Sequence, residues 1–455
     1  MSESIALFWF RRDLRLEDNV GLYRALESGF PVVPIFIFDT EILDKLPKAD
    51  ARVSFIHEQL LHINMELKNR FGSGIATYHG KPVKIFEELL KKYSVNLVFT
   101  NHDYEPYAIK RDTEIRQLLN RHGVEFNTYK DQVIFEKDEI LNGGGLPYKV
   151  YTPYKNRWMA LFSPSAHLKK YDSPNFHKFY ESDELPFLGL EALGFERSKI
   201  QVKDFDLNTD LIDNYGETRD IPSLDKGTSR LGPHLRFGTI SIRAVVREAV
   251  KSENKTFLNE LIWREFFMQI LWHFPHTVTK AFKPKYDNIS WRNNEAEFNL
   301  WKTGKTGFVL VDAGMRQLNA TGYMHNRVRM VVASFLCKHL LIDWRWGEAY
   351  FALKLLDFEL ASNVGNWQWA AGSGVDAAPY FRIFNPTSQL SKFDAQGEYI
   401  NKWVPEFQEL SYPPEMVNHQ ILYLKNIQSL YLRDKYLPNR NCYPPNLFAL
   451  IFFVI

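Results

Sequence analysis

Three residues with functional side chains fall on one face of an expected helix. Glu260, Trp263 and Arg264 are spaced by three and four positions, which brings them together on an α-helix. The surrounding stretch, Phe257–Phe274, is apolar nearly all round, as in a buried helix. A Glu–Arg pair at this spacing is usually a surface ion pair, but unpaired charge is costly in apolar surroundings. The pattern favours a functional pocket at least as much as a surface pair.

A second polar group lies in the segment Met324–Met330, which reads Met-His-Asn-Arg-Val-Arg-Met. Asn326, Arg329 and Met330 share a helix face, and Arg327 projects to its side. Two guanidinium groups and an amide on an apolar helix indicate an anionic or hydrogen-bonding ligand. Ordinary solvation of the helix is the alternative.

A hydroxyl-bearing turn precedes another expected helix. It consists of Thr228, Ser229, Arg230, Leu231 and Gly232. Such a turn offers free backbone N–H groups to phosphate oxygens. Capping of the helix by a hydroxyl explains the same pattern equally well.

Several short motifs fail for lack of context. Gly372–Ala377 fits G-x-G-x-x-A but does not open a strand–turn–helix unit. Gly304–Thr306 lacks the first glycine of a phosphate loop, since Asn299 stands there. No zinc-protease motif or nucleophile elbow occurs. The two cysteines, Cys337 and Cys442, exclude a disulfide framework and a multi-cysteine metal site, and we expect no metal.

The composition is that of a folded protein rich in aromatic residues. A length of 455 residues predicts two or three domains. Lys and Arg number 56 against 54 Asp and Glu, a net charge of +2, which excludes a polycation but not a local basic face. Aromatic residues make up 15% of the chain, which indicates a large core and leaves room for a site for flat π-systems. The N-terminus predicts neither secretion nor a membrane span, so we expect a cytoplasmic protein.

Alternating strand and helix signals organise residues 1–130. We expect strands at residues 6–10, 32–38, 75–79, 95–100 and 124–129, and between them helices at residues 53–67, 82–93 and 107–122. This alternation predicts an α/β domain with a doubly wound, parallel five-stranded sheet. Such sheets bind ligands beyond the carboxyl ends of their strands.

The strand signal fades after the first domain. Residues 131–200 contain Gly and Pro clusters and predict an interdomain connector packed on the surface. Residues 201–455 predict an all-α domain, because the stretches 257–274, 324–342 and 348–360 read as buried helices. The apolar end, Leu447–Ile455, is too short to cross a bilayer.

These segments resemble the photolyase/cryptochrome family of flavoproteins, and within it the bacterial class I cyclobutane pyrimidine dimer photolyases. The resemblance extends from Phe8–Arg15 to about Trp403. It is densest in four segments, Asn259–Phe266, Gly307–Phe335, Asn366–Trp369 and Asp376–Pro386. It implies an N-terminal antenna-binding α/β domain and a C-terminal helical domain that binds FAD and DNA.

Carried over residue by residue, the resemblance implies three sets of functional residues. The FAD ligands would be Tyr215, Thr228, Ser229, Arg230, Leu231, Gly232, Phe257, Glu260, Arg264, Asn326, Arg329, Asp357, Glu359 and Asn363. The lesion cavity and the DNA contacts would be formed by Glu260, Trp263, Arg264, Asn326, Arg327, Met330, Trp369 and Arg382. The catalytic set would comprise Glu260, Asn363 at the flavin N5, and an electron-transfer chain of Trp291, Trp344 and Trp367.

The implied activity is light-driven repair of UV-damaged DNA by a carbon–carbon lyase acting as a monomer. Reduced, excited FAD would donate an electron to a dimer flipped out of the duplex, the ring would split, and the electron would return. The alternatives are a cryptochrome photoreceptor and a (6-4) photolyase. Asn363 argues against a cryptochrome. The resemblance implies a pair of histidines in a (6-4) photolyase, and the single His325 here argues against that activity.

Some positions depart from the family pattern. Gly232 replaces a frequent serine, and Phe257 stands where well-studied relatives have tryptophan. Tyr107 and Ala108 occupy the positions at which folate-binding relatives place Asn and Glu. The antenna chromophore is therefore left open among a deazaflavin, FMN, folate or none.

Overall fold

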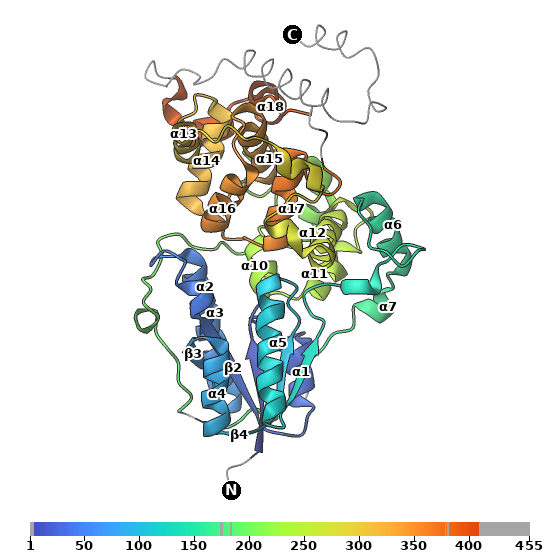
Figure 1. Cartoon of the computed structure of the whole chain (residues 1–455), viewed down its shortest axis with the longest axis vertical. Helices are drawn as coiled ribbons and strands as arrows, with labels where there is room; N and C mark the ends of the chain where they lie inside the picture. The colour runs from blue at the N-terminus through green and yellow to red at the C-terminus, as the bar shows by residue number, and fades with distance from the viewer. Residues whose placement is uncertain (1–3, 173–175, 183, 378, 380–381, 409–455) are drawn as a thin grey trace.

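The computed structural model describes residues 4–172, 176–182, 184–377, 379 and 382–408. Figure 1 shows an α/β unit that contains the N-terminus and a helical unit stacked on one end of its sheet. Cys442 and the apolar end Leu447–Ile455 lie outside the described residues.

All five strands of the N-terminal sheet run parallel. They are β1 (Ser4–Phe10), β2 (Val32–Asp39), β3 (Ala76–Gly80), β4 (Ser94–Asn101) and β5 (Glu125–Tyr129), in the spatial order β3-β2-β1-β4-β5. The five expected strands and the doubly wound fold are confirmed. The order in which strands are added to the sheet reverses between β1 and β4. The carboxyl ends of these two strands face the helical unit (Figure 1).

Helices cover both faces of this sheet. The five helices are α1 (Val20–Leu26), α2 (Thr40–Leu43), α3 (Ala51–Phe71), α4 (Pro82–Lys92) and α5 (Pro106–Arg121). Phe8 and Phe10 pack with apolar residues of α1 and α3, whereas Leu7 and Trp9 pack with those of α4 and α5. The three long helices were expected from periodicity, while α1 and α2 are too short to produce a clear period.

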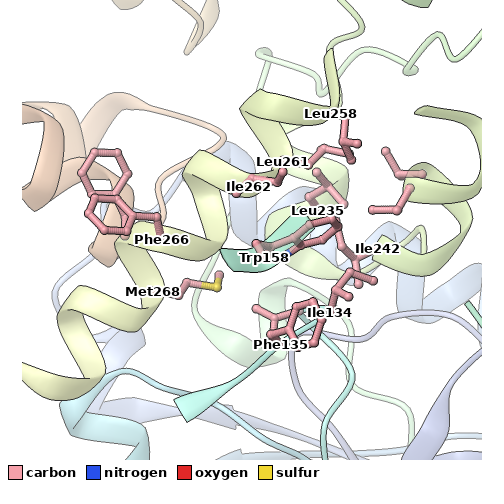
Figure 2. Packing of buried hydrophobic residues seen from close by; sticks show 14 of the residues in the cluster. Ile134, Phe135, Trp158, Leu235, Ile242, Leu258, Leu261, Ile262, Phe266 and Met268 are labelled. Atoms are coloured by element: carbon pink, nitrogen blue, oxygen red, sulfur yellow. The ribbon is translucent and has the colours of Figure 1, made fainter. Parts of the chain in front are cut away.

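The segment between the two units contains more regular structure than its sequence pattern indicated. It includes α6 (Tyr151–Leu161), α7 (Pro164–His167), and the 3₁₀ turns η1 (Lys137–Glu139), η2 (Phe176–Lys178) and η3 (Glu191–Leu193). Pro153 lies in the first turn of α6, where proline is tolerated, so it did not mark a break. Trp158 of α6 is 1% exposed and packs near Ile134, Ile242 and the helix of Phe266 (Figure 2).

The chain after residue 200 is helical, as expected. Its elements are α8 (Thr209–Asp213), α9 (Tyr215–Thr218), α10 (Gly232–Phe237), α11 (Ile242–Ala249), α12 (Thr256–His273), η4 (Pro275–Val278), η5 (Pro284–Asn288), α13 (Glu295–Thr303), α14 (Val309–Thr321), α15 (Asn326–Ser334), η6 (Phe335–His339), α16 (Trp344–Lys354), α17 (Leu360–Ala371), α18 (Pro386–Phe393), α19 (Glu398–Trp403) and η7 (Pro405–Gln408). Among the described residues, no helix is both long and apolar enough to span a bilayer.

Two expected helices have different bounds in the structure. The prediction of one helix over 348–360 is wrong: α16 ends at Lys354 and α17 begins at Leu360. Glu359 caps α17 by accepting a hydrogen bond from Ser362 N (3.0 Å), which fixes the new start. The expected helix over 324–342 begins at Asn326, because the His325 ring caps it, and ends in the π-helical turn η6.

The two units meet at a close backbone approach. Leu14 N donates to Phe237 O (3.0 Å), and Gly238 adopts a left-handed φ of +65°. A Cβ atom at Gly238 would lie 2.1 Å from Arg12 O, so only glycine fits. Arg12 pairs with Asp103 (3.2 Å) within the α/β unit, and its other terminal nitrogen lies 3.5 Å from Glu359 of the helical unit. The sheet and the helical unit are therefore held in a fixed relation.

Candidate functional site

One cavity of the helical unit gathers eight of the expected site residues. Its volume is about 90 Å³, and its walls come from α15, α16, α17 and the segment between α16 and α17. The expected residues among its lining are Asn326, Arg329, Met330, Asp357, Glu359, Asn363, Trp367 and Trp369. Residues separated by over 40 positions in the sequence thus face one space.

A larger cavity of about 400 Å³ lies beside the first, and both are lined by Asp357. Arg230 and Gly232 of the expected phosphate turn form part of its wall. Arg230 has a left-handed φ of +57°, and its guanidinium lies 3.7 Å from the centroid of the Tyr323 ring. Tyr323 also approaches the Thr228 hydroxyl (3.4 Å), so an aromatic residue supports this turn from outside.

Asp357 links the phosphate turn to α15. Its Oδ2 accepts a hydrogen bond from Arg329 Nη2 (2.9 Å). A Cβ atom at Gly232 would lie 2.7 Å from the Asp357 side chain, so this carboxyl group occupies the space that a serine would need. The departure from the family pattern at Gly232 therefore has a packing reason.

Asn363 lines the cavity, and hydrogen bonds to Glu348 fix the orientation of its amide group. Its Nδ2 donates to Glu348 Oε1 (2.8 Å) and to Glu348 O (3.1 Å). Because the amide nitrogen is engaged by α16, the amide oxygen is left for a ligand in the cavity. Burial raises the pKa of Glu348.

Glu359 connects the cavity to the α/β unit. Burial acts to raise the pKa of this carboxyl group, but the charges of Arg12, Arg236 and Arg264 bring it below its ordinary value. Glu359 is thus held as a carboxylate by arginines from three different elements.

The expected residues of α12 form a second group. Phe257 is buried and meets Tyr215 edge to face, with ring centroids 5.2 Å apart. Glu260 Oε1 accepts a hydrogen bond from Arg219 Nη1 (2.6 Å), and Trp263 stacks on Tyr151 with a centroid separation of 3.6 Å. None of these residues lines the cavity of about 90 Å³ around Asn363.

The three arginines expected at DNA phosphates are in different surroundings. Arg327 is paired with Asp220 (2.7 Å) and lies over the Phe393 ring. The Arg382 residue is exposed. Arg264, by contrast, donates to Gln132 O (2.8 Å) and Leu235 O (3.4 Å), and burial lowers its pKa to about 10. Arg264 is therefore bonded to the protein backbone. It does not lie at an exposed position, which a contact with a DNA phosphate requires.

The three expected electron-transfer tryptophans belong to one hydrophobic cluster. Trp344 and Trp367 are 1% and 2% exposed, and the half-buried Trp291 packs against the same cluster. Trp367 also contacts a tryptophan that the sequence did not single out, Trp301, with ring centroids 6.2 Å apart.

Four contacting residues were missed at the sequence level: Arg219, Tyr151, Glu348 and Trp301. Each touches an expected site residue from another element, and no spacing in the sequence connects the two. Arg219 is the most informative, because its pairing with Glu260 joins positions 41 residues apart. No pattern in the sequence indicates this pair, because Arg264 already stands at the spacing of a local partner for Glu260.

Comparison with known proteins identifies the family. Residues 6–174 match the family model of DNA photolyase, and residues 257–437 match that of the FAD binding domain of DNA photolyase. A deoxyribodipyrimidine photo-lyase of Agrobacterium fabrum is 38% identical over 427 residues, which covers 89% of this chain and 88% of the relative. The chain belongs to the DNA photolyase family.

Solved structures of photolyases agree with this assignment. A bacterial class III photolyase from Agrobacterium tumefaciens superposes with a TM-score of 0.86 at 33% identity, covering 96% of this chain and 98% of that one. An archaeal photolyase from Sulfolobus tokodaii, described with two FAD molecules, superposes with a TM-score of 0.82 at 34% identity, covering 95% and 100%.

The residues present fit the FAD that this photolyase domain binds. Asp357 Oδ1 is buried and has no hydrogen-bond partner among the described residues, so a donor of a ligand would satisfy it. The two cavities that share Asp357 extend from the phosphate turn to Asn363, which suits an elongated dinucleotide. Tyr107 and Ala108 stand where folate-binding relatives have Asn and Glu; Tyr107 donates to Asp39 Oδ2 (2.5 Å), and Ala108 is buried.

Proposed function

We propose that this protein splits cyclobutane pyrimidine dimers in UV-damaged DNA by a light-driven reaction that uses FAD. The observation that carries the proposal is the cavity in which Asn326, Met330 and Trp369 face the same space as Asn363 and Asp357. It supports the proposal because residues expected to contact the lesion line the same cavity as residues expected to bind the flavin. When bound and reduced, FAD supplies the electron that opens the cyclobutane ring after light absorption.

The chain's own residues would bind and orient both partners. Arg329 and Asp357 would meet the polar edge of the flavin, and the oxygen of Asn363 would accept a hydrogen bond near its N5. Trp369 would stack on the extruded bases, a contact worth about 1–3 kcal/mol per base. Glu260, held by Arg219, would hydrogen-bond the pyrimidine edge.

Arginines at the rim would bind the DNA backbone without reading its sequence. Arg327 and Arg382 are candidates for phosphate contacts, so binding should weaken as salt rises. Asp220 orients Arg327 but also neutralises part of its charge. We further propose that the active species is a monomer located in the cytoplasm.

A second chromophore stays part of the proposal. The Sulfolobus tokodaii relative is described with two FAD molecules and with the implication of a novel light-harvesting cofactor. A second flavin is therefore our preferred candidate over folate, because Tyr107 and Ala108 replace the Asn and Glu of folate-binding relatives.

One experiment tests the activity. The purified protein is checked for FAD by its absorbance, reduced, and mixed with an oligothymidylate that contains cyclobutane dimers under blue light. Recovery of thymine absorbance in the light and not in the dark is expected. Absence of recovery despite bound, reduced flavin would contradict the proposal, and repair of a (6-4) substrate instead would favour the other photolyase chemistry.

A further inference from the structure

A buried lysine follows the helix that carries Asn326 and Met330. Lys338 lies in the π-helical turn η6, which is closed by a hydrogen bond from Leu340 N to Phe335 O (3.1 Å). The residue is only 8% exposed. Because a buried ammonium group is costly unless acceptors surround it, its acceptors indicate what it does. Single π-turns within helices occur frequently at functional sites.

The Lys338 ammonium group bonds the backbone of two described residues, Pro379 and Arg382. Nζ donates to Arg382 O (2.8 Å) and to Pro379 O (3.3 Å). Arg382 N also donates to Pro379 O (2.9 Å), so these two residues are bonded to each other as well. Two residues further on, Phe384 N donates to Ser334 Oγ (3.4 Å). The backbone at Pro379, Arg382 and Phe384 is thus attached to α15 and η6.

The side chain of Arg382 has different surroundings from its backbone. The residue is exposed, and among the described residues its guanidinium forms no ion pair. Arg327, in contrast, is already paired with Asp220. A fixed backbone with a free guanidinium suits a phosphate contact, because less freedom is lost when DNA binds.

We propose that Lys338 is a positioning residue for DNA binding, which holds the backbone of Pro379 and Arg382 so that Arg382 meets a backbone phosphate beside the lesion. The inference rests on the proposed function. Phe384 stacks near Trp369, with ring centroids 6.2 Å apart, so the same anchored segment also borders the lesion cavity. Burial and then the charge of Arg382 lower the pKa of Lys338 to about 8, as expected if the two cations are close.

The test compares DNA binding by Lys338→Met, Arg382→Ala and the double variant. Binding of the FAD-containing proteins to a dimer-containing duplex is measured over a series of salt concentrations. One lost phosphate contact lowers the slope of log K against log salt by about 0.9. Lys338→Met should reduce the slope by the same amount as Arg382→Ala, and the double variant should lose no more than either single one.

Lys255→Met is the matched control. Lys255 also donates to two backbone carbonyl oxygens, Val250 O (3.1 Å) and Ser252 O (2.5 Å), but before α12. Lys255→Met should leave the slope of log K against log salt unchanged. Lys338→Arg should largely restore the wild-type slope. If Lys338→Met does not retain FAD, Lys338→Gln replaces it, with a reduced slope expected again.

The outcomes separate this inference from the proposed function. An unchanged slope in the Lys338 variants beside a reduced slope in Arg382→Ala overturns the role of Lys338. An unchanged slope in Arg382→Ala itself overturns the phosphate contact of Arg382 and leaves nothing for Lys338 to position.

Discussion

Glu260 and Arg264 are spaced as an ion pair along α12, yet they do not pair. Glu260 bonds Arg219, while Arg264 turns to the backbone carbonyls of Gln132 and Leu235. The two charged residues of this helix face therefore bond to different parts of the protein. Glu260 is half-buried and remains near a binding surface, and Arg264 ties the helix to the segment that follows the sheet.

Glu260→Ala should lower the yield of dimer repair several-fold while FAD content changes little. The substitution removes a hydrogen-bond acceptor and leaves Arg219 without its partner. Repair is measured as thymine recovery per absorbed photon, and FAD by absorbance. Glu253→Ala, at an exposed acidic residue just before α12, is the control. Repair equal to that of the wild type would refute the role of Glu260.

Trp367→Phe should block photoreduction of the flavin but spare repair by chemically reduced protein. Trp367 both lines the cavity and belongs to the tryptophan cluster, so it is placed to pass an electron between them. Trp346→Phe is a matched control, since Trp346 packs on Phe298 in the same cluster but lies outside the expected chain. Loss of repair in the chemically reduced sample would show that Trp367 has another role.

At the scale of elements, the packing of α16 against α17 depends on one glycine. A Cβ atom at Gly347 would lie 2.1 Å from the rigid indole of Trp367 and 2.6 Å from Leu336. The sequence showed an apolar stretch over 348–360 but not that two helices meet there. The break at Leu355–Glu359 depends on a backbone hydrogen bond from Leu356 N to Gly322 O (2.9 Å), a contact between distant segments.

Gly347→Ala should therefore destabilise the protein and slow photoreduction. Glycine to alanine in an exposed helix stabilises by about 1 kcal/mol, but overpacking of a core costs roughly 1–3 kcal/mol. The net loss is measured by thermal unfolding, and photoreduction by flavin absorbance under light. Gly189→Ala, where an added Cβ meets nothing within 4 Å, should change neither. Unchanged photoreduction in Gly347→Ala would mean that Trp367 is not displaced.

At the scale of the whole molecule, the two units differ in how far the sequence predicts them. The parallel sheet follows from the alternation of short apolar strands with amphipathic helices, which is a local signal. The helical unit could be predicted as helical, and the resemblance placed Asn326, Asp357 and Asn363 together. Partners such as Arg219 for Glu260, or Lys338 for the backbone of Arg382, depend on tertiary packing that no period in the sequence encodes.

Glu265 joins three parts of the molecule and should make stability depend on pH. Its carboxyl group accepts hydrogen bonds from Ile134 N (2.7 Å) and Phe135 N (3.1 Å) after the sheet, and from Trp158 Nε1 (2.7 Å) of α6. Burial raises the pKa of Glu265 to about 7, because the carboxylate loses more hydration than these donors replace. The folded state thus holds a proton that the unfolded chain releases near pH 4.5.

The stabilisation from this proton is complete below about pH 4.5 and is lost as the pH rises to about 7. Its size is roughly 3 kcal/mol, from the shift in pKa of Glu265. The free energy of unfolding is compared between the wild type and Glu265→Gln, whose side chain does not titrate, at several pH values across this range. The advantage of the wild type should shrink as the pH rises, because groups common to both proteins cancel. A constant difference across the range would show that Glu265 does not change protonation on folding.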